Sequence, residues 1–157
     1  MPLLINEDGS SWRTDFSTDE LLAAIRQHEL PQCLEDTVVG NVPGPLQYWC
    51  ERVTNNGVWP LQDDFIPVWT TNGTSCLAYE PSINKFTYQH IEDVPEGAHN
   101  TFDSFAHVSV WVLLDLIGSK GEDEIRLAAK FLGFDKVDEL LACSSVEEFH
   151  AKVQLDP

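Results

Sequence analysis

Three runs of the sequence decide the fold: FIPVWTTNGTSCLAYE at residues 65–80, KFTYQHI at 85–91 and SFAHVSVWVLLDLI at 104–117. The first run holds Asn72-Gly73 between two segments rich in β-branched and aromatic residues. Asn-Gly is the strongest short-range signal for a β-hairpin, because a two-residue type I′ turn needs a positive φ angle at both positions. The second run predicts a third strand. The first strand is apolar on both faces, which predicts a sheet covered on one side and partly packed on the other.

Two further features of these runs refine the expected fold. Pro67 cannot donate a hydrogen bond to a neighbouring strand, so the first strand is predicted to lie at a sheet edge or to contain a bulge. The third run has almost no polar face and predicts a central core helix, capped by Asp103 or Ser104. The sequence therefore predicts one α+β domain over residues 1–157, with a small, mainly antiparallel sheet packed against helices and a helical C-terminal part.

The flanking segments are predicted to be mostly helical. Residues 17–20 and 145–148 have capping-box spacing, which predicts one helix that ends before Pro31 and another over 145–153. Two more helices are predicted over 121–133 and 135–141. Residues 31–45, rich in Pro and Gly, are predicted to form a connecting loop, and residues 46–53 a short helix closed by Gly57.

The chain is strongly acidic. It has 157 residues, 26 Asp and Glu against 9 Lys and Arg, and a formal net charge of −17. This charge repels nucleic acid and anionic lipid and favours a partner with a basic surface, since a large field steers oppositely charged partners. At 43% hydrophobic residues the chain can build a core. Its longest apolar run, 110–114, is far too short to span a membrane.

The sequence offers no catalytic or metal-binding motif. The four cysteines are widely spaced, without a Cys-x-x-Cys pair, and the N-terminus does not resemble a signal peptide, so a reduced cytoplasmic protein is expected. The five histidines lack metal-ligand spacing, and His107 is expected to be a hydrogen-bonded interior residue. Gly-rich phosphate loops and Gly-x-Ser-x-Gly are absent. The sequence thus predicts a protein that is not an enzyme and has no cofactor and no metal.

Acidic pairs flank the predicted sheet and are the candidate partner-binding residues. One pair precedes the first strand and a second cluster follows the third strand. These positions lie at opposite ends of a meander, which favours a broad acidic surface over a single metal site. Solvated loop carboxylates are the alternative. Trp is enriched at binding hot spots, so Trp59 is added as an interface anchor, whereas Trp69 is expected in the core. The candidate partner-binding residues are Asp63, Asp64, Glu92, Asp93, Glu96 and Trp59.

The order of these pieces resembles the SUKH superfamily, the group of a fungal cell-wall regulator and many bacterial immunity proteins. The matching pieces are a segment ending in Asn-Asn-Gly (46–57), the Phe-Ile-Pro-Val strand with its Asn-Gly turn and the Cys-Leu-Ala-Tyr strand (65–80), a further strand (85–91), and Ser-Phe before the long apolar helix (104–116). The resemblance does not extend to residues 1–40 or to the helices after Gly121. The acidic residue usual after the Asn-Gly turn is replaced by Thr74.

The resemblance implies a function. It implies a non-enzymatic immunity protein that binds a cognate bacterial toxin, often a nuclease, and blocks its substrate site. The acidic charge is compatible with this, because nuclease sites that hold phosphates are basic. Two alternatives remain open: a regulatory or scaffold module of the same fold, and an acidic mimic of nucleic acid that inhibits a DNA-binding protein.

Overall fold

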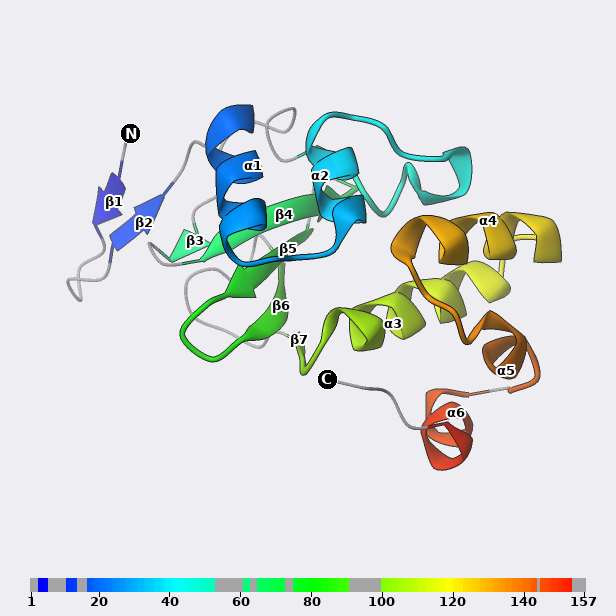
Figure 1. Ribbon diagram of the computed structural model, residues 1–157. Coiled ribbons are helices and arrows are strands. Elements are labelled where there is room, and N and C mark those ends of the chain that lie inside the picture. Colours follow the sequence, from blue (N-terminus) through cyan, green and yellow to red (C-terminus); the bar gives the residue numbers. More distant parts are fainter. Residues whose placement is uncertain are drawn as a thin grey trace.

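The computed structural model describes residues 3–5, 11–13, 17–52, 61–62, 65–72, 75–90, 100–143 and 145–153. Over these residues the α+β fold class is confirmed: a four-stranded antiparallel sheet packs against helices, and a second, smaller sheet lies at the N-terminal side (Figure 1). The four-stranded sheet consists of β4 (Ile66–Thr71), β5 (Ser75–Glu80), β6 (Lys85–His90) and β7 (Asn100–Phe102).

The predicted hairpin is confirmed as β4 and β5, which pair antiparallel from Ile66↔Tyr79 to Thr71↔Ser75. Asn72 follows β4 with a φ angle of 52°, the left-handed conformation that an Asn-Gly turn favours. The third strand is confirmed as β6, which pairs with the other side of β5. The turns between successive strands therefore set the order of β4, β5 and β6 in the sheet.

The prediction for Pro67 is confirmed in both respects. The sheet order β4-β5-β6-β7 places β4 at an edge, and the pairing register with β5 shifts between Pro67 and Trp69. The missing N–H of proline is tolerated there, because no neighbouring strand of the four-stranded sheet pairs with the outer side of β4 and a bulge interrupts the ladder.

The smaller sheet has the order β1-β2-β3 and was not predicted. It joins Leu3–Ile5, Ser11–Arg13 and Leu61–Gln62, all antiparallel. Strands of two or three residues are too short to show the alternation of apolar and polar residues on which a strand prediction rests.

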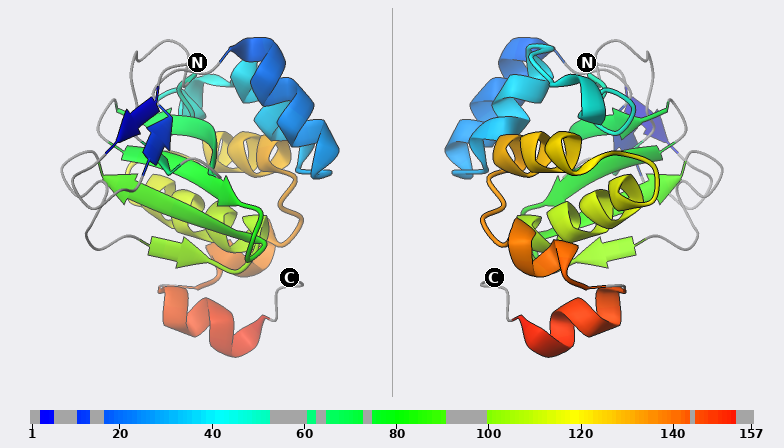
Figure 2. Two further views of the ribbon diagram at one scale, coloured as in Figure 1. Left: turned by 90° about the vertical axis from the view of Figure 1, so that its left-hand side faces the viewer. Right: turned by 90° about the vertical axis from the view of Figure 1, so that its right-hand side faces the viewer.

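Helix α3 (Phe105–Ile117) is the central core helix that the sequence predicts. Ser104 is its N-cap and accepts a hydrogen bond from the His107 backbone N–H at 3.4 Å. Figure 2 shows α3 lying across one face of the four-stranded sheet, with α4 (Glu122–Leu132) beside it. Trp69 of β4 is fully buried, and the centroid of its ring lies 5.8 Å from that of Phe105 in α3.

Two helices, α1 (Thr18–Gln27) and α2 (Gln32–Val38), pack beside β4 at the edge of the sheet (Figure 1). Helix α1 is confirmed, with Ser17 accepting from the Glu20 N–H at 3.1 Å. The loop predicted over 31–45 is wrong for its first half, because 32–38 is helical. Proline at the N-cap is compatible with a helix start, and α2 buries Cys33, Leu34, Thr37 and Val38 on one face.

The short helix predicted over 46–53 is also wrong in its described part. A 3₁₀ turn, η1 (Gly44–Leu46), precedes a turn at 47–50. Glu51 then exchanges two backbone hydrogen bonds of 2.9 Å with Thr70 on β4. This pairing with a distant strand replaces the helical hydrogen bonds that the local apolar pattern suggested. Gly57 lies outside the described residues.

The C-terminal helices are confirmed. Gly121 is the N-cap of α4 and Gly133 ends that helix with a φ angle of 72°, in the left-handed region. Helix α5 spans Val137–Leu141. Helix α6 spans Val146–Lys152, and Ser145 caps it by accepting from the Glu148 N–H at 3.0 Å. Phe149 of α6 is fully buried, so this last helix belongs to the core.

Candidate functional site: a groove between α2 and α4

The partner-binding residues that the sequence singles out lie outside the described residues: Asp63, Asp64, Glu92, Asp93, Glu96 and Trp59. Their role stays a prediction. The strands that flank the two acidic clusters are described, and their register relates the start of β4 to the end of β6. Ile66 is level with Phe86 through Tyr79, whereas Thr71 is level with His90 through Ser75. The start of β4 and the end of β6 are therefore at opposite ends of the sheet, as predicted.

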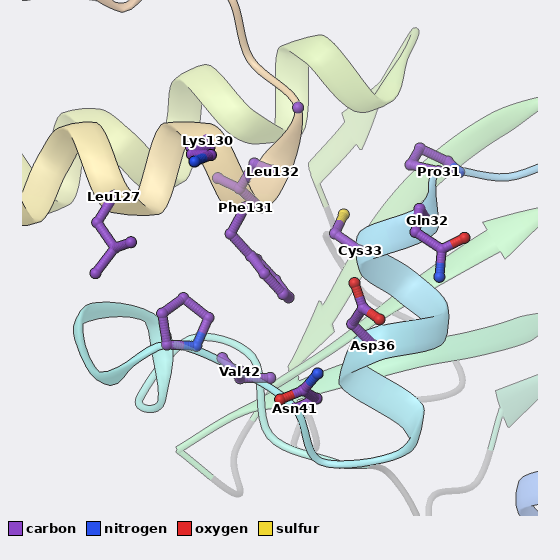
Figure 3. A pocket seen from close by; sticks show the side chains of 12 residues that line it. Pro31, Gln32, Cys33, Asp36, Asn41, Val42, Leu127, Lys130, Phe131 and Leu132 are labelled. Atoms are coloured by element: carbon purple, nitrogen blue, oxygen red, sulfur yellow. The ribbon is translucent and has the colours of Figure 1, made fainter.

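An open groove lies between α2, the loop at 39–46 and α4. Its volume is about 680 Å³. Its apolar lining includes Leu127 and Phe131 from α4 and Val42 from the loop. In Figure 3 the Phe131 ring points from α4 into the space between the two helices, and Leu127 points toward the loop. Leu127 is 48% exposed, so its side chain is accessible to a partner.

Helix α4 positions this lining through its helical period. Ile125, Ala128, Ala129 and Leu132 face the core and are buried. Leu127 and Phe131 are four residues apart, so they stand one above the other on a different stripe. That stripe is the signal that sequence analysis missed: two large apolar residues displaced from the buried face of an amphipathic helix. The opposing wall could not be foreseen, because residues 32–38 were predicted to be a loop.

The polar groups of the groove are few. Asp36 of α2 and Lys130 of α4 are the charged residues of its lining, and both are labelled in Figure 3. On α2 the neighbouring Glu35 forms a 2.8 Å salt bridge with Arg26 of α1, which ties the two helices together. The groove thus offers a mainly apolar floor, with one carboxylate and one ammonium group.

The thiol in the groove is not a nucleophile. Cys33 is 3% exposed, and burial, followed by the negative charge of Asp36, raises the pKa of its thiol to about 12. Burial likewise raises the pKa of Cys50 and of Cys76 well above the ordinary value. A thiol attacks as its thiolate, so these three cysteines are unreactive at neutral pH. Their burial as small apolar side chains agrees with the sequence prediction for Cys50 and Cys76.

One serine and one histidine are in contact, but the contact belongs to a helix start. Ser104 Oγ lies 2.7 Å from Nδ1 of His107, and the two residues are three apart at the first turn of α3. The same hydroxyl accepts the backbone N–H of His107, as an N-cap does. This pair therefore stabilises the helix end. The predicted hydrogen bonding of His107 is confirmed, but the residue is half-buried at the start of α3 and not in the interior.

Within the described ranges, no group of three or more His, Cys, Asp or Glu side chains is placed to hold a metal ion. None of the described helices has the length and apolar character required to cross a bilayer.

Comparison with known proteins gives no match: no family model, no curated protein and no solved structure is significantly similar to this chain. The resemblance to the SUKH superfamily accordingly stays a prediction from the sequence.

Proposed function

We propose that this protein is a non-enzymatic immunity protein of the SUKH type, acting in the bacterial cytoplasm. It binds a basic toxin domain, of the nuclease type, and occludes the substrate site of that toxin. The single observation that carries the proposal is an exposed apolar groove on a molecule whose net charge is −17. The charge brings a basic partner to the surface, and the groove gives that partner a place to bury an apolar side chain.

The charge supports the choice of partner at long range. Several exposed carboxylates have no basic partner among the residues that the structure describes, so their charge is not neutralised locally. A field of this sign accelerates the approach of a basic protein and repels phosphate backbones. These carboxylates are Asp19, Glu29, Asp123, Glu124, Asp135, Glu139 and Glu147.

The groove supports the proposal at short range. Its occupant is an apolar side chain of the toxin, flanked by basic residues that face the acidic surface. Burying a Leu-sized side chain contributes about 1.5–3 kcal/mol, which corresponds to roughly 10- to 100-fold in affinity. Electrostatic attraction then sets the association rate, and the groove sets how long the complex lasts.

Toxicity rescue tests the proposal directly. Each toxin-like gene encoded beside the gene of this protein is expressed in a susceptible bacterium with and without it, and growth is measured. The proposal predicts that one toxin is neutralised and co-purifies with the protein. Binding without neutralisation would indicate a regulatory or scaffold module, and failure to protect against any neighbouring toxin overturns the proposal.

A matched pair of variants locates the interface. Leu127→Gln removes the exposed apolar group of the groove, whereas Ile83→Gln changes an equally exposed residue (50%) in the turn between β5 and β6. Leu127→Gln is expected to weaken toxin binding about tenfold or more, and Ile83→Gln to leave it unchanged. Equal effects of the two variants would exclude the groove as the contact surface.

Salt dependence separates the two contributions. Screening shortens the reach of the charges to about 8 Å near physiological ionic strength, so the association rate should fall as salt rises. The dissociation rate of the wild-type complex should change little, because it depends on the apolar contact. An association rate that does not respond to salt would mean that the net charge plays no part in partner choice.

A further inference from the structure

A second cavity, of about 270 Å³, lies where α3, the β4–β5 hairpin, β6 and the segment after η1 meet. Its lining shares no residue with the groove between α2 and α4. It combines aromatic rings with a single carboxylate: Tyr48, Trp49, Tyr88, Trp111 and Asp115. We call this site the aromatic pocket.

The carboxylate is held in place by one of the rings. Trp111 and Asp115 are four residues apart on α3, so their side chains are neighbours on the helix surface. The indole N–H of Trp49 donates a hydrogen bond to Asp115 Oδ2 at 3.1 Å. This bond directs an exposed carboxylate toward the rings.

Three of these rings, those of Trp49, Tyr88 and Trp111, pack against one another. The centroid of Trp111 lies 5.3 Å from that of Trp49 and 4.8 Å from that of Tyr88, at interplanar angles of 74° and 55°. Trp49 and Tyr88 are 6.3 Å apart and inclined by 77°. Trp49 and Tyr88 are largely covered in this cluster, at 8% and 5% exposed, so a bound group meets aromatic surface mainly at the half-buried Trp111 and at Tyr48. Tyr48, which is 56% exposed, lies 6.1 Å from Trp49 at the outer side.

A directed chain of hydrogen bonds fixes these rings before any ligand binds. The Thr71 hydroxyl donates to the Trp49 carbonyl at 2.9 Å. A hydroxyl has one proton, so in the 3.0 Å contact between Thr71 and Tyr88 the phenol must be the donor. The Tyr88 oxygen in turn accepts from the indole N–H of Trp69. A pocket ordered in advance loses less conformational entropy on binding.

The chemistry of the aromatic pocket selects a cation that carries N–H groups. Ring faces attract cations, and the carboxylate adds a full negative charge. An ionised carboxylate only accepts hydrogen bonds, and Asp115 keeps acceptor sites beyond the one that the Trp49 N–H occupies. Among the described residues, no basic side chain pairs with Asp115. Guanidinium both stacks on aromatic faces and donates to carboxylates, whereas a quaternary ammonium has no N–H to donate.

We propose that the aromatic pocket binds the guanidinium group of an arginine side chain presented by a partner protein. The volume of about 270 Å³ lies below the roughly 300–1,000 Å³ of pockets for drug-sized ligands, so the aromatic pocket has the size for a single side chain. The inference does not depend on the proposed function, because it concerns a separate site and holds for any partner with an exposed arginine.

The test uses the whole protein and N-acetyl-arginine methylamide as the probe. Binding is followed by NMR through the indole N–H signals of Trp49 and Trp111, at constant ionic strength. The matching citrulline compound is the neutral control, and lysine and tetramethylammonium are the cationic controls. The arginine probe is expected to shift both signals and to bind at least about tenfold more tightly than the citrulline compound. Equal binding of citrulline, or tighter binding of tetramethylammonium, overturns the proposal.

Two variants and a control complete the test. Asp115→Asn removes the charge but keeps an acceptor for the Trp49 N–H, and it is expected to weaken the arginine probe about tenfold. Tyr48→Ser removes an exposed ring and should weaken binding several-fold. Asp19→Asn removes the same charge from α1 and should leave the affinity unchanged. Equal losses in Asp115→Asn and Asp19→Asn would show general attraction to an acidic protein and would refute a specific pocket.

Discussion

One pair of substitutions tests the hydrogen-bond network of the aromatic pocket, because one of the two hydroxyls is bonded in that network and the other has no partner in the described residues. Thr71→Val and Thr87→Val make the same chemical change, hydroxyl to methyl, at two buried positions of one sheet. Thr71 is 7% exposed and connects the Trp49 carbonyl with the Tyr88 phenol. Thr87, on β6, is 1% exposed, and its hydroxyl has no hydrogen-bond partner in the described part of the structure.

The two variants are expected to change stability in opposite directions. Thr71→Val leaves two buried groups without their partner, the Trp49 carbonyl and the Tyr88 hydroxyl proton. Each such group costs about 1–3 kcal/mol, so the free energy of unfolding should fall by about 2–4 kcal/mol. Thr87→Val removes a buried hydroxyl that makes no bond and should raise the free energy of unfolding by about 1 kcal/mol.

Urea unfolding, followed by tryptophan fluorescence and by circular dichroism, measures both changes. An unchanged slope of the free energy against urea would show that only stability has changed. Near-equal destabilisation by the two variants would refute the reasoning, since the difference depends entirely on the partners of the two hydroxyls. A neutral Thr71→Val would mean that the directed chain from Trp69 to Trp49 does not exist in solution.

Further predictions concern two glycines, the order of thiol labelling and the pH dependence of stability. Gly133→Ala should lower the free energy of unfolding by about 1 kcal/mol, because a Cβ there meets no atom within 4 Å and only the left-handed φ angle is unfavourable. Gly118→Ala, at a φ angle of −73°, should raise it by about 0.5 kcal/mol. In the native protein a thiol reagent should label the half-buried Cys143 first, and the three buried cysteines only after unfolding. The folded-state pKa of Cys33 exceeds its unfolded value, so its contribution to stability is complete below about pH 9 and is lost as pH rises toward about 12. Urea midpoints measured across that window, with the Cys33→Ala variant for comparison, test this sign.

Local signals in the sequence predict much of the fold. The Asn72-Gly73 turn, the serine caps and the unbroken apolar character of 105–117 each act within a few residues, and the elements that these signals predict are present. The loop prediction over 31–45 is wrong for 32–38 because it depended on the proline and glycine content of the segment. Pro31 stands just before α2, where a proline does not interrupt the hydrogen bonds of the helix. The helix expected over 46–53 failed because Glu51 pairs with Thr70, and no local pattern reveals a partner 19 positions away.

The sites were harder to predict than the fold. The acidic clusters that the sequence singled out lie outside the described residues, so their role still depends on experiment. The groove is lined by two apolar residues of α4 and by helix α2. The sequence predicts a loop in place of α2, so it does not predict the groove. The aromatic pocket assembles Trp49, Tyr88, Trp111 and Asp115 from three elements distant in sequence, and only tertiary packing brings them together.

The geometry of β4 has a consequence for self-association. An exposed edge strand is a template on which another chain can add a strand and start an aggregate. Here one part of that edge lacks an N–H, at Pro67, and another part is occupied by the bridge from Thr70 to Glu51. Strand addition along β4 is hindered at both points, so this edge is expected to be a poor template for aggregation.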